Sequence, residues 1–173
     1  MGKKILSHFK PGEVNAREML EQIAIKLNGY SQNRDFPIQN NTSLLSPYLA
    51  RGELSVNEIF FSVKRNKKKF NNDDYIKFTS QLGWREFSYN ILYNFPKLPN
   101  KNFVSKFDNF PWLKNSKYLS SWKKGSTGYP IVDAGMRELR ATGYMHNRLR
   151  MIVASFLIKN LNISWVDGAK WFW

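Results

Sequence analysis

The chain has 173 residues, of which 42% are hydrophobic and 16% aromatic, so it can bury a sizeable core, and its length favours one domain over two. Without cysteine it can form no disulfide framework, no thiolate zinc site and no cysteine-held iron–sulfur cluster. Its 27 Lys+Arg against 13 Asp+Glu leave a net charge of +14, which attracts polyanions such as DNA, RNA or an anionic membrane surface.

No segment of the sequence predicts membrane insertion. The longest apolar run, residues 151–158, is interrupted by Ser155 and is far too short to span a bilayer. The start at residues 1–4 lacks the apolar region of a signal peptide. We therefore expect a soluble, cytoplasmic protein without a membrane partner.

Helical spacing dominates the first half of the chain. A helix is predicted between the Pro-Gly pair at residues 11–12 and Gly29, with apolar residues at i, i+4, i+7 and i+11. A polar stretch without clear periodicity follows over residues 31–46. The stripe of the predicted helix consists of Ala16, Leu20, Ile23 and Leu27.

Two further helices are predicted before residue 94. Ser55 and Glu58 have the spacing of a capping box, which opens a helix that carries Ile59 and Val63. The pair at residues 73–74, both Asp, precedes another helix. Its apolar positions include Phe78, Leu82 and Ile91. Between these two helices, the basic cluster at residues 64–69 is equally compatible with a solvated loop and with a polyanion contact.

The second half begins with an irregular segment. Residues 94–128 are rich in Pro, Asn, Lys and Trp and predict a long ordered connection. Pro130 suits the first turn of a helix that Gly143 ends, residues 145–160 predict the most apolar helix, and Ser164 opens a last one. With no repeat and no alternating strand pattern, the predicted fold is all-α. The aromatic residues expected to pin the connection are Phe107, Phe110, Trp112 and Trp122.

One face of the helix over residues 145–160 combines unlike groups. Asn147, Arg150, Met151 and Ala154 lie at i, i+3, i+4 and i+7. A buried face normally carries apolar groups, so an amide and a guanidinium there need polar partners or face solvent. The residues alone leave both interpretations open: a surface that faces a ligand, or an ordinary exposed polar face.

Three motifs resemble the FAD-binding domain of the DNA photolyase/cryptochrome family, and specifically class I cyclobutane pyrimidine dimer photolyases. They are the run GYPIVDAGMR at residues 128–137, the run MHNRLRM at residues 145–151, and Trp165. The resemblance extends over nearly the whole chain and implies a helical flavoprotein that repairs DNA with light. Because family members are longer at both ends, we expect an incomplete domain over residues 1–173, without the N-terminal α/β domain that holds an antenna pigment and without the C-terminal end.

The resemblance also implies FAD contacts. Residues 30–37, followed by residues 42–49, are similar to the diphosphate-binding segment of the family. Independently of that, hydroxyl groups and the N–H groups at a helix start can form an anion cradle, although an ordinary capped turn is the simpler interpretation of these residues by themselves. The predicted FAD contacts are Tyr30, Thr42, Ser43, Leu44, Leu45, Ser46, Phe78, Arg85, Asn147 and Arg150.

Other family positions imply contacts with the lesion. Trp84 matches a residue that packs against the flipped dimer, and the alternative is a core Trp beside an exposed charge pair at residues 85–86. Gln81 stands where many dimer-repairing relatives carry a glutamate; it can form hydrogen bonds but cannot donate an acidic proton. Asn147 and Met151 stand where the branch that repairs (6-4) photoproducts has histidines. We therefore predict four catalytic residues: Trp84, Gln81, Asn147 and Met151.

The remaining predictions concern DNA and electron transfer. Trp84, Tyr144 and Arg148 are the predicted DNA contacts, and Tyr144 and Phe78 are smaller aromatic residues than many relatives have there. The two Trp residues that match the electron-transfer chain could instead be core anchors. His146 is expected to pack or form hydrogen bonds. The two electron-transfer residues are Trp112 and Trp165.

The favoured interpretation is a monomeric photolyase that binds FAD and damaged DNA and has no metal site. Two alternatives remain open from the sequence. One is a cryptochrome-like blue-light sensor with the same flavin pocket and no repair activity. The other is a non-catalytic, basic fragment that binds DNA.

Overall fold

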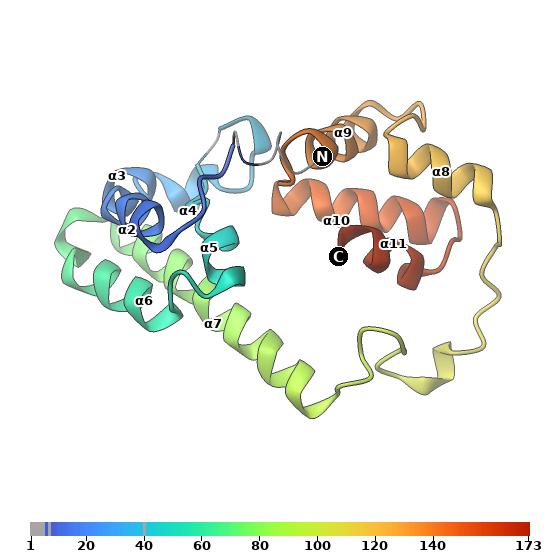
Figure 1. Ribbon diagram of the computed structural model, residues 1–173, viewed down its shortest axis with the longest axis horizontal. Coiled ribbons are helices and arrows are strands. Elements are labelled where there is room, and N and C mark those ends of the chain that lie inside the picture. The colour runs from blue at the N-terminus through green and yellow to red at the C-terminus, as the bar shows by residue number, and fades with distance from the viewer. Residues whose placement is uncertain (1–5, 7, 40) are drawn as a thin grey trace. The chain divides into compact units, whose positions relative to one another are not determined.

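The computed structural model describes residues 6, 8–39 and 41–173, and these residues form helices and turns with no strand (Figure 1). The all-α prediction is therefore confirmed. The start at residues 1–4 lies outside the described residues. None of the described helices is long and apolar enough to cross a membrane. The chain divides into two compact units, residues 2–89 and 90–173, which we call the N-terminal and C-terminal units.

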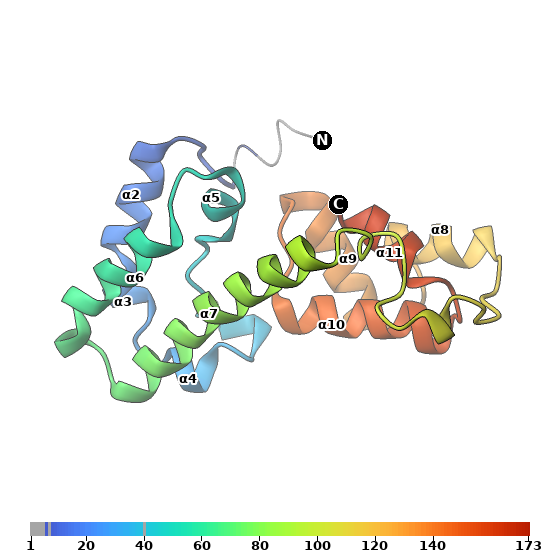
Figure 2. The same cartoon turned by 90° about the horizontal axis from the view of Figure 1, so that it is seen from below.

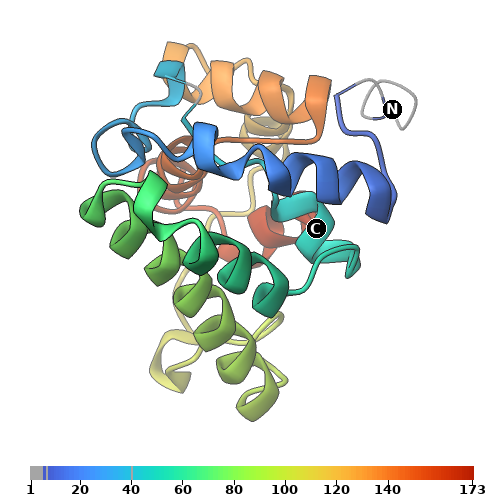
Figure 3. The ribbon, with the colours of Figure 1, turned by 90° about the vertical axis from the view of Figure 1, so that its left-hand side faces the viewer.

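The N-terminal unit packs its helices around one apolar core (Figure 3). All four residues of the apolar stripe predicted between residues 12 and 29 are buried in this core. The stripe is divided between two helices, where one helix was predicted. The break is at Gln22, because the Ile25 N–H donates to the Gln22 carbonyl at 3.1 Å, an i to i+3 bond that interrupts the α-helical hydrogen-bond pattern. The helices are α2 (Glu13–Glu21), α3 (Ile23–Lys26), α4 (Tyr30–Asn33), α5 (Ser46–Arg51), α6 (Val56–Arg65) and most of α7 (Asn72–Asn94).

The predicted starts of α6 and α7 have different outcomes. The capping box of α6 is confirmed, since Ser55 Oγ accepts the Glu58 N–H at 3.0 Å, and Ile59 and Val63 are buried. The 23-residue helix α7, visible along its length in Figure 2, begins before the acidic pair instead of after it. Asp74 thus lies within the first turn of α7, where it is buried.

The C-terminal unit has a second, separate core. Within it, α9 packs against both α8 and α10, and α11 packs against η4. Gly143 ends α9 with a left-handed φ of 73°, as predicted, and the π-helical segment η4 continues α10 directly. The elements are α8 (Ser116–Lys124), α9 (Pro130–Thr142), α10 (Asn147–Ser155), η4 (Phe156–Asn160) and α11 (Trp165–Phe172).

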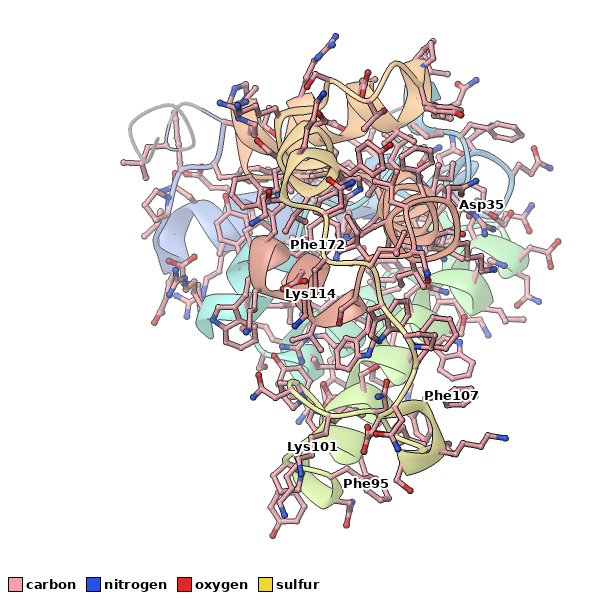
Figure 4. All side chains as sticks on the ribbon, turned by 90° about the vertical axis from the view of Figure 1, so that its right-hand side faces the viewer. Asp35, Phe95, Lys101, Phe107, Lys114 and Phe172 are labelled. Atoms are coloured by element: carbon pink, nitrogen blue, oxygen red, sulfur yellow. The ribbon has the colours of Figure 1, made fainter. Side chains whose placement is uncertain are left out.

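The expectation for residues 94–128 was wrong in two respects. They include α8, which starts where the Asn115 side chain accepts the Tyr118 N–H at 3.0 Å. Trp122 on α8 is buried as expected and donates its indole N–H to the Val153 carbonyl at 2.9 Å. However, Phe107 (labelled in Figure 4) and Phe110 are 49% and 44% exposed, so they do not pin the connection. Aromatic content alone does not say which rings reach a core.

The turn before α9 is organised by a buried carboxylate. Asp133 accepts the Thr127 N–H at 2.7 Å, the Thr127 hydroxyl at 2.6 Å and the Gly128 N–H at 2.9 Å. Burial alone would raise the pKa of the Asp133 carboxyl. The hydrogen bonds from Thr127 and Gly128, together with the charge of Arg137, outweigh this effect, so the pKa lies below its ordinary value.

Replacing this carboxylate is expected to change the pH dependence of stability. Because the pKa is lower in the folded state, Asp133 stabilises the fold above about pH 4, and this contribution is lost as the pH falls through the folded value. Asp133→Asn leaves a buried N–H unpaired and should lower the free energy of unfolding at neutral pH by about 2 kcal/mol. Urea unfolding of both proteins across this pH range measures the difference. A difference that does not shrink in acid would contradict the assignment.

Candidate functional site

The turn at residues 42–46 has the backbone of an anion-binding site. Leu44 has a left-handed φ of 56°, and Leu45 follows with φ −82° and ψ −10°. Such a change of hand between neighbours directs successive backbone N–H groups into one concavity. The turn runs directly into α5, where the N–H groups of Ser46 and Tyr48 have no partner within the helix and Pro47 has no N–H group. Phosphate oxygens are the kind of ligand that this arrangement accepts.

The side chains of this turn contribute unequally. Ser43 is half-buried, and its Oγ accepts the Leu45 N–H at 3.4 Å. Ser46 is exposed, so its hydroxyl is accessible to a ligand. The Leu45 side chain lies in the core of the N-terminal unit, which leaves only its backbone for a ligand contact. Thr42 and Leu44 are both half-buried.

Asp74 fixes the loop that carries Tyr30. Its two carboxylate oxygens accept the Gly29 N–H at 2.9 Å and the Ser31 N–H at 2.6 Å, on either side of Tyr30. The Tyr30 ring meets the Phe78 ring edge-on, with centroids 5.6 Å apart. Both rings are buried, so the structure brings these two predicted FAD contacts together with little of either ring accessible to a ligand.

The middle of α7 carries the predicted lesion contacts Gln81 and Trp84. Trp84 is 63% exposed and meets Phe87 edge-on at 5.8 Å, so it is not the core tryptophan of the alternative interpretation. Arg85 donates to the Leu49 carbonyl at 3.2 Å and pairs with Glu86 at 2.8 Å, which holds its guanidinium in place. Gln81 is half-buried and makes only a long hydrogen bond, 3.4 Å, to a carbonyl of its own helix.

The helix α10 has one face that packs against the core and one face that is exposed. Leu149 and Val153 enter the core of the C-terminal unit. Asn147, Arg150 and Met151 are exposed, and the Asn147 amide lies 3.8 Å from the Met151 sulfur. Arg150 donates to the Met145 carbonyl at 3.1 Å, and Ala154 is half-buried. The polar residues are therefore held at a surface instead of being buried.

The start of α10 depends on His146. This buried side chain accepts the Arg148 N–H on Nδ1 at 3.1 Å, which agrees with the expected hydrogen-bonding role. The helix accordingly begins at Asn147, two residues after the predicted start. Arg148 is exposed in the first turn, and Tyr144 is half-buried, with its N–H donated to Thr142 Oγ1 at 3.1 Å.

The two predicted electron-transfer residues line one pocket of the C-terminal unit. Trp112 comes from the connection before α8, and Trp165 is the first residue of α11. The Trp165 indole N–H donates to Asn102 Oδ1 at 2.8 Å. Both side chains are half-buried, in contrast to Trp122, so neither is a fully enclosed core anchor.

Comparison with protein families matches residues 78–173 to the FAD binding domain of DNA photolyase. This range is more than half of the chain. The chain belongs to the DNA photolyase/cryptochrome family. The matched range contains the α7 and α10 faces and both pocket tryptophans, whereas Tyr30 and the turn at residues 42–46 precede it.

Individual photolyases and cryptochromes match over almost the whole chain. It is 48% identical over 165 residues to a deoxyribodipyrimidine photo-lyase of Agrobacterium fabrum, covering 95% of this chain and 34% of that one. It is 41% identical over 173 residues to cryptochrome-2 of Arabidopsis thaliana, covering 95% and 28%. The crystal structure of a bacterial class III photolyase from Agrobacterium tumefaciens matches with a TM-score of 0.95 and 46% identity, covering 98% and 36%. The chain thus spans about a third of the length of these photolyases.

Some residues that organise the candidate site were missed in the sequence. Asp74 was interpreted only as a helix-start residue, and Asp133 and Asn102 were given no separate role. Each of them acts by accepting N–H groups from residues at the site: the neighbours of Tyr30, the turn of the GYPIVDAGMR motif, and Trp165. An acidic residue in the first turn of a helix was the one available signal for Asp74.

Replacing Asp74 tests whether it fixes the Tyr30 loop. In Asp74→Asn one oxygen becomes an NH₂ group that faces a backbone N–H, which should lower the free energy of unfolding by about 1–3 kcal/mol. Asp73→Asn, at the exposed neighbouring position, is the matched control and should cost no more than about 1 kcal/mol. Urea unfolding measures both. Equal losses in the two variants would contradict this role of Asp74.

Proposed function

We propose that residues 1–173 form part of an FAD-binding domain of a deoxyribodipyrimidine photo-lyase, which uses light to open cyclobutane pyrimidine dimers in DNA. The observation that carries this proposal is the 48% identity to an enzyme of that name over 95% of the chain. The donor groups and exposed aromatic residues described above provide physical support.

The turn at residues 42–46 has the donor set that a diphosphate requires. Its N–H groups and the Ser46 hydroxyl would bind phosphate oxygens, and the change of hand at Leu44 supports this fit. Arg85 adds positive charge in the same unit, with its guanidinium held by the Leu49 carbonyl. In the C-terminal unit, the Arg150 guanidinium is held by the Met145 carbonyl, and Arg150 is proposed as an FAD contact from the family resemblance alone. Bound and reduced FAD would supply light-driven electron transfer to the lesion, with the electron returning to the flavin once the dimer has opened. The protein's part is to bind and orient the reacting groups.

DNA binding is supported by charge and by exposed aromatic surface. A net charge of +14 favours a polyanion, and Trp84 offers an open indole face for a base that has left the stack. Gln81 would contact the dimer through hydrogen bonds alone. Asn147 and Met151, in the C-terminal unit, are proposed as dimer contacts from the family resemblance. Arg148, exposed at the start of α10, and Tyr144 would contact the strand near the lesion.

Electron supply to the flavin is proposed for Trp112 and Trp165. An indole can lose an electron transiently while its packing and its N–H hydrogen bond stay in place. The hydrogen bond from Trp165 to Asn102 supports this role because it holds the ring still during the transfer.

A second candidate function is blue-light sensing, favoured by the 41% identity to cryptochrome-2 over 95% of the chain. A sensor would use the same FAD contacts and tryptophans without repairing DNA. The two functions differ in one product: only repair restores the pyrimidines of a dimer.

Illumination of a dimer-containing oligonucleotide with the FAD-loaded, reduced protein tests the proposal. We expect recovered thymines, measured by chromatography, and a repair rate about 10-fold lower in Trp84→Ala because a stacking surface is lost. Tyr93→Ala, at another exposed aromatic residue of α7, is the control and should repair normally. Light-dependent reduction of bound FAD without recovered thymines would favour the sensor, and DNA retardation without any FAD binding would favour a non-catalytic DNA-binding protein.

Arg148→Ala tests the proposed strand contact. Loss of a phosphate contact should weaken binding to damaged and undamaged DNA alike and reduce the slope of log K against log salt by about 1. Fluorescence anisotropy at several salt concentrations measures both quantities. Arg140→Ala, at an exposed position on α9, is the matched control. An unchanged salt slope in Arg148→Ala would contradict the contact.

A further inference from the structure

The C-terminal unit contains a pocket of about 510 Å³ whose walls are largely aromatic. Four rings line it, from the connection before α8 and from the start of α11. Its volume lies within the range of small-molecule sites, which is about 300–1,000 Å³. Flat rings on the walls favour a flat, aromatic ligand. The four rings belong to Phe107, Phe110, Trp112 and Trp165.

Hydrogen bonds and ring contacts hold these walls in place. The Trp165 indole donates to Asn102 Oδ1 at 2.8 Å, and the Asn102 amide donates in turn to Asp108 at 2.7 Å. The Phe110 and Trp112 rings lie 4.4 Å apart between centroids. A ligand would therefore meet a surface that is already ordered, which lowers the entropic cost of binding.

Asn162 lines another side of the pocket. Asn162 has a left-handed φ of 51°, a conformation uncommon for residues other than glycine. Its carbonyl accepts the Leu113 N–H at 2.8 Å, and its amide donates to the Pro111 carbonyl at 3.4 Å. These bonds tie the segment around Trp112 to the end of η4.

Among the described residues, Lys159 is the one ionised residue of the pocket lining, and the Asp108 carboxylate, outside that lining, is hydrogen-bonded to Asn102. The ammonium of Lys106 lies 5.2 Å from the centre of the Phe107 ring. No carboxylate lines the pocket, and none of the ion pairs found in the described part of the chain involves Lys159. An ammonium at the edge of an aromatic pocket fits a phosphate that is attached to a planar ring.

We propose that this pocket binds a nucleotide-type ligand, with its aromatic ring against the indole and phenyl rings and its phosphate at Lys159. The pocket shares no residue with the predicted FAD contacts, so it is a second, separate site. It does share Trp112 and Trp165 with the proposed electron-transfer chain, and a bound ring would touch both indoles. The proposal rests on the geometry of the C-terminal unit and does not require repair activity.

Titration of the protein with AMP tests the site, with tryptophan fluorescence and calorimetry as readouts. We expect saturable quenching, because two indoles form the walls. Lys159→Gln should raise the Kd about 5-fold, and Phe110→Ala should raise it about 10-fold through lost stacking. Adenosine should bind more weakly than AMP, and ribose 5-phosphate, which has no aromatic ring, should not quench. Circular dichroism checks that both variants fold; both replaced side chains are exposed.

Two controls locate the binding. Lys170→Gln, at an exposed lysine of α11 outside the pocket lining, should leave AMP binding unchanged. Arg150→Ala, at a predicted FAD contact, should also leave it unchanged. If Arg150→Ala abolishes AMP binding while Lys159→Gln does not, AMP occupies the proposed flavin site; the pocket proposal is then overturned and the proposed function stands. The absence of saturable AMP binding would overturn it as well.

Discussion

Buried carboxylates that accept backbone N–H groups fix the turns on which both units depend. A backbone N–H that is removed from water without a partner costs free energy, and a carboxylate satisfies two of them at once. Asp74 does this on either side of Tyr30 in the N-terminal unit. Asp133 does it for Thr127 and Gly128 in the C-terminal unit, and thereby sets the start of α9. Each carboxylate binds a loop to a helix that is itself anchored in a core.

The same helices provide the packing and the candidate site. On α7, Phe78 and Leu82 enter a core while Trp84 stays exposed. On α10, Leu149 and Val153 pack inward while Asn147 and Met151 face outward. Because the packed face has one well-defined arrangement, the exposed face on the same rigid helix is held as well. Hydrogen bonds add to this for the charged groups: Arg85 donates to the Leu49 carbonyl and Arg150 to the Met145 carbonyl.

Tryptophan has two different roles in the C-terminal unit. Trp122 is fully buried, and its indole N–H donates to a main-chain carbonyl of α10. Trp165 is half-buried, and its N–H donates to the side chain of Asn102 beside an open pocket. Both rings are fixed, but only the second can touch a ligand. Trp165 therefore lies at a pocket outside the predicted FAD contacts, and Trp122 does not.

The amino-acid sequence by itself determined the helical class, the family, the capping box of α6 and the end of α9 at Gly143. Periodicity, caps and family motifs all depend on residues that are close together in the chain. Only the tertiary structure decided that Phe107 and Phe110 stay exposed, that α8 forms within a predicted connection, and how the candidate site is supported. The Ser31–Asp74 and Asn102–Trp165 hydrogen bonds join residues 43 and 63 positions apart. Local spacing carries no information about such pairs, since the packing of distant segments brings them together.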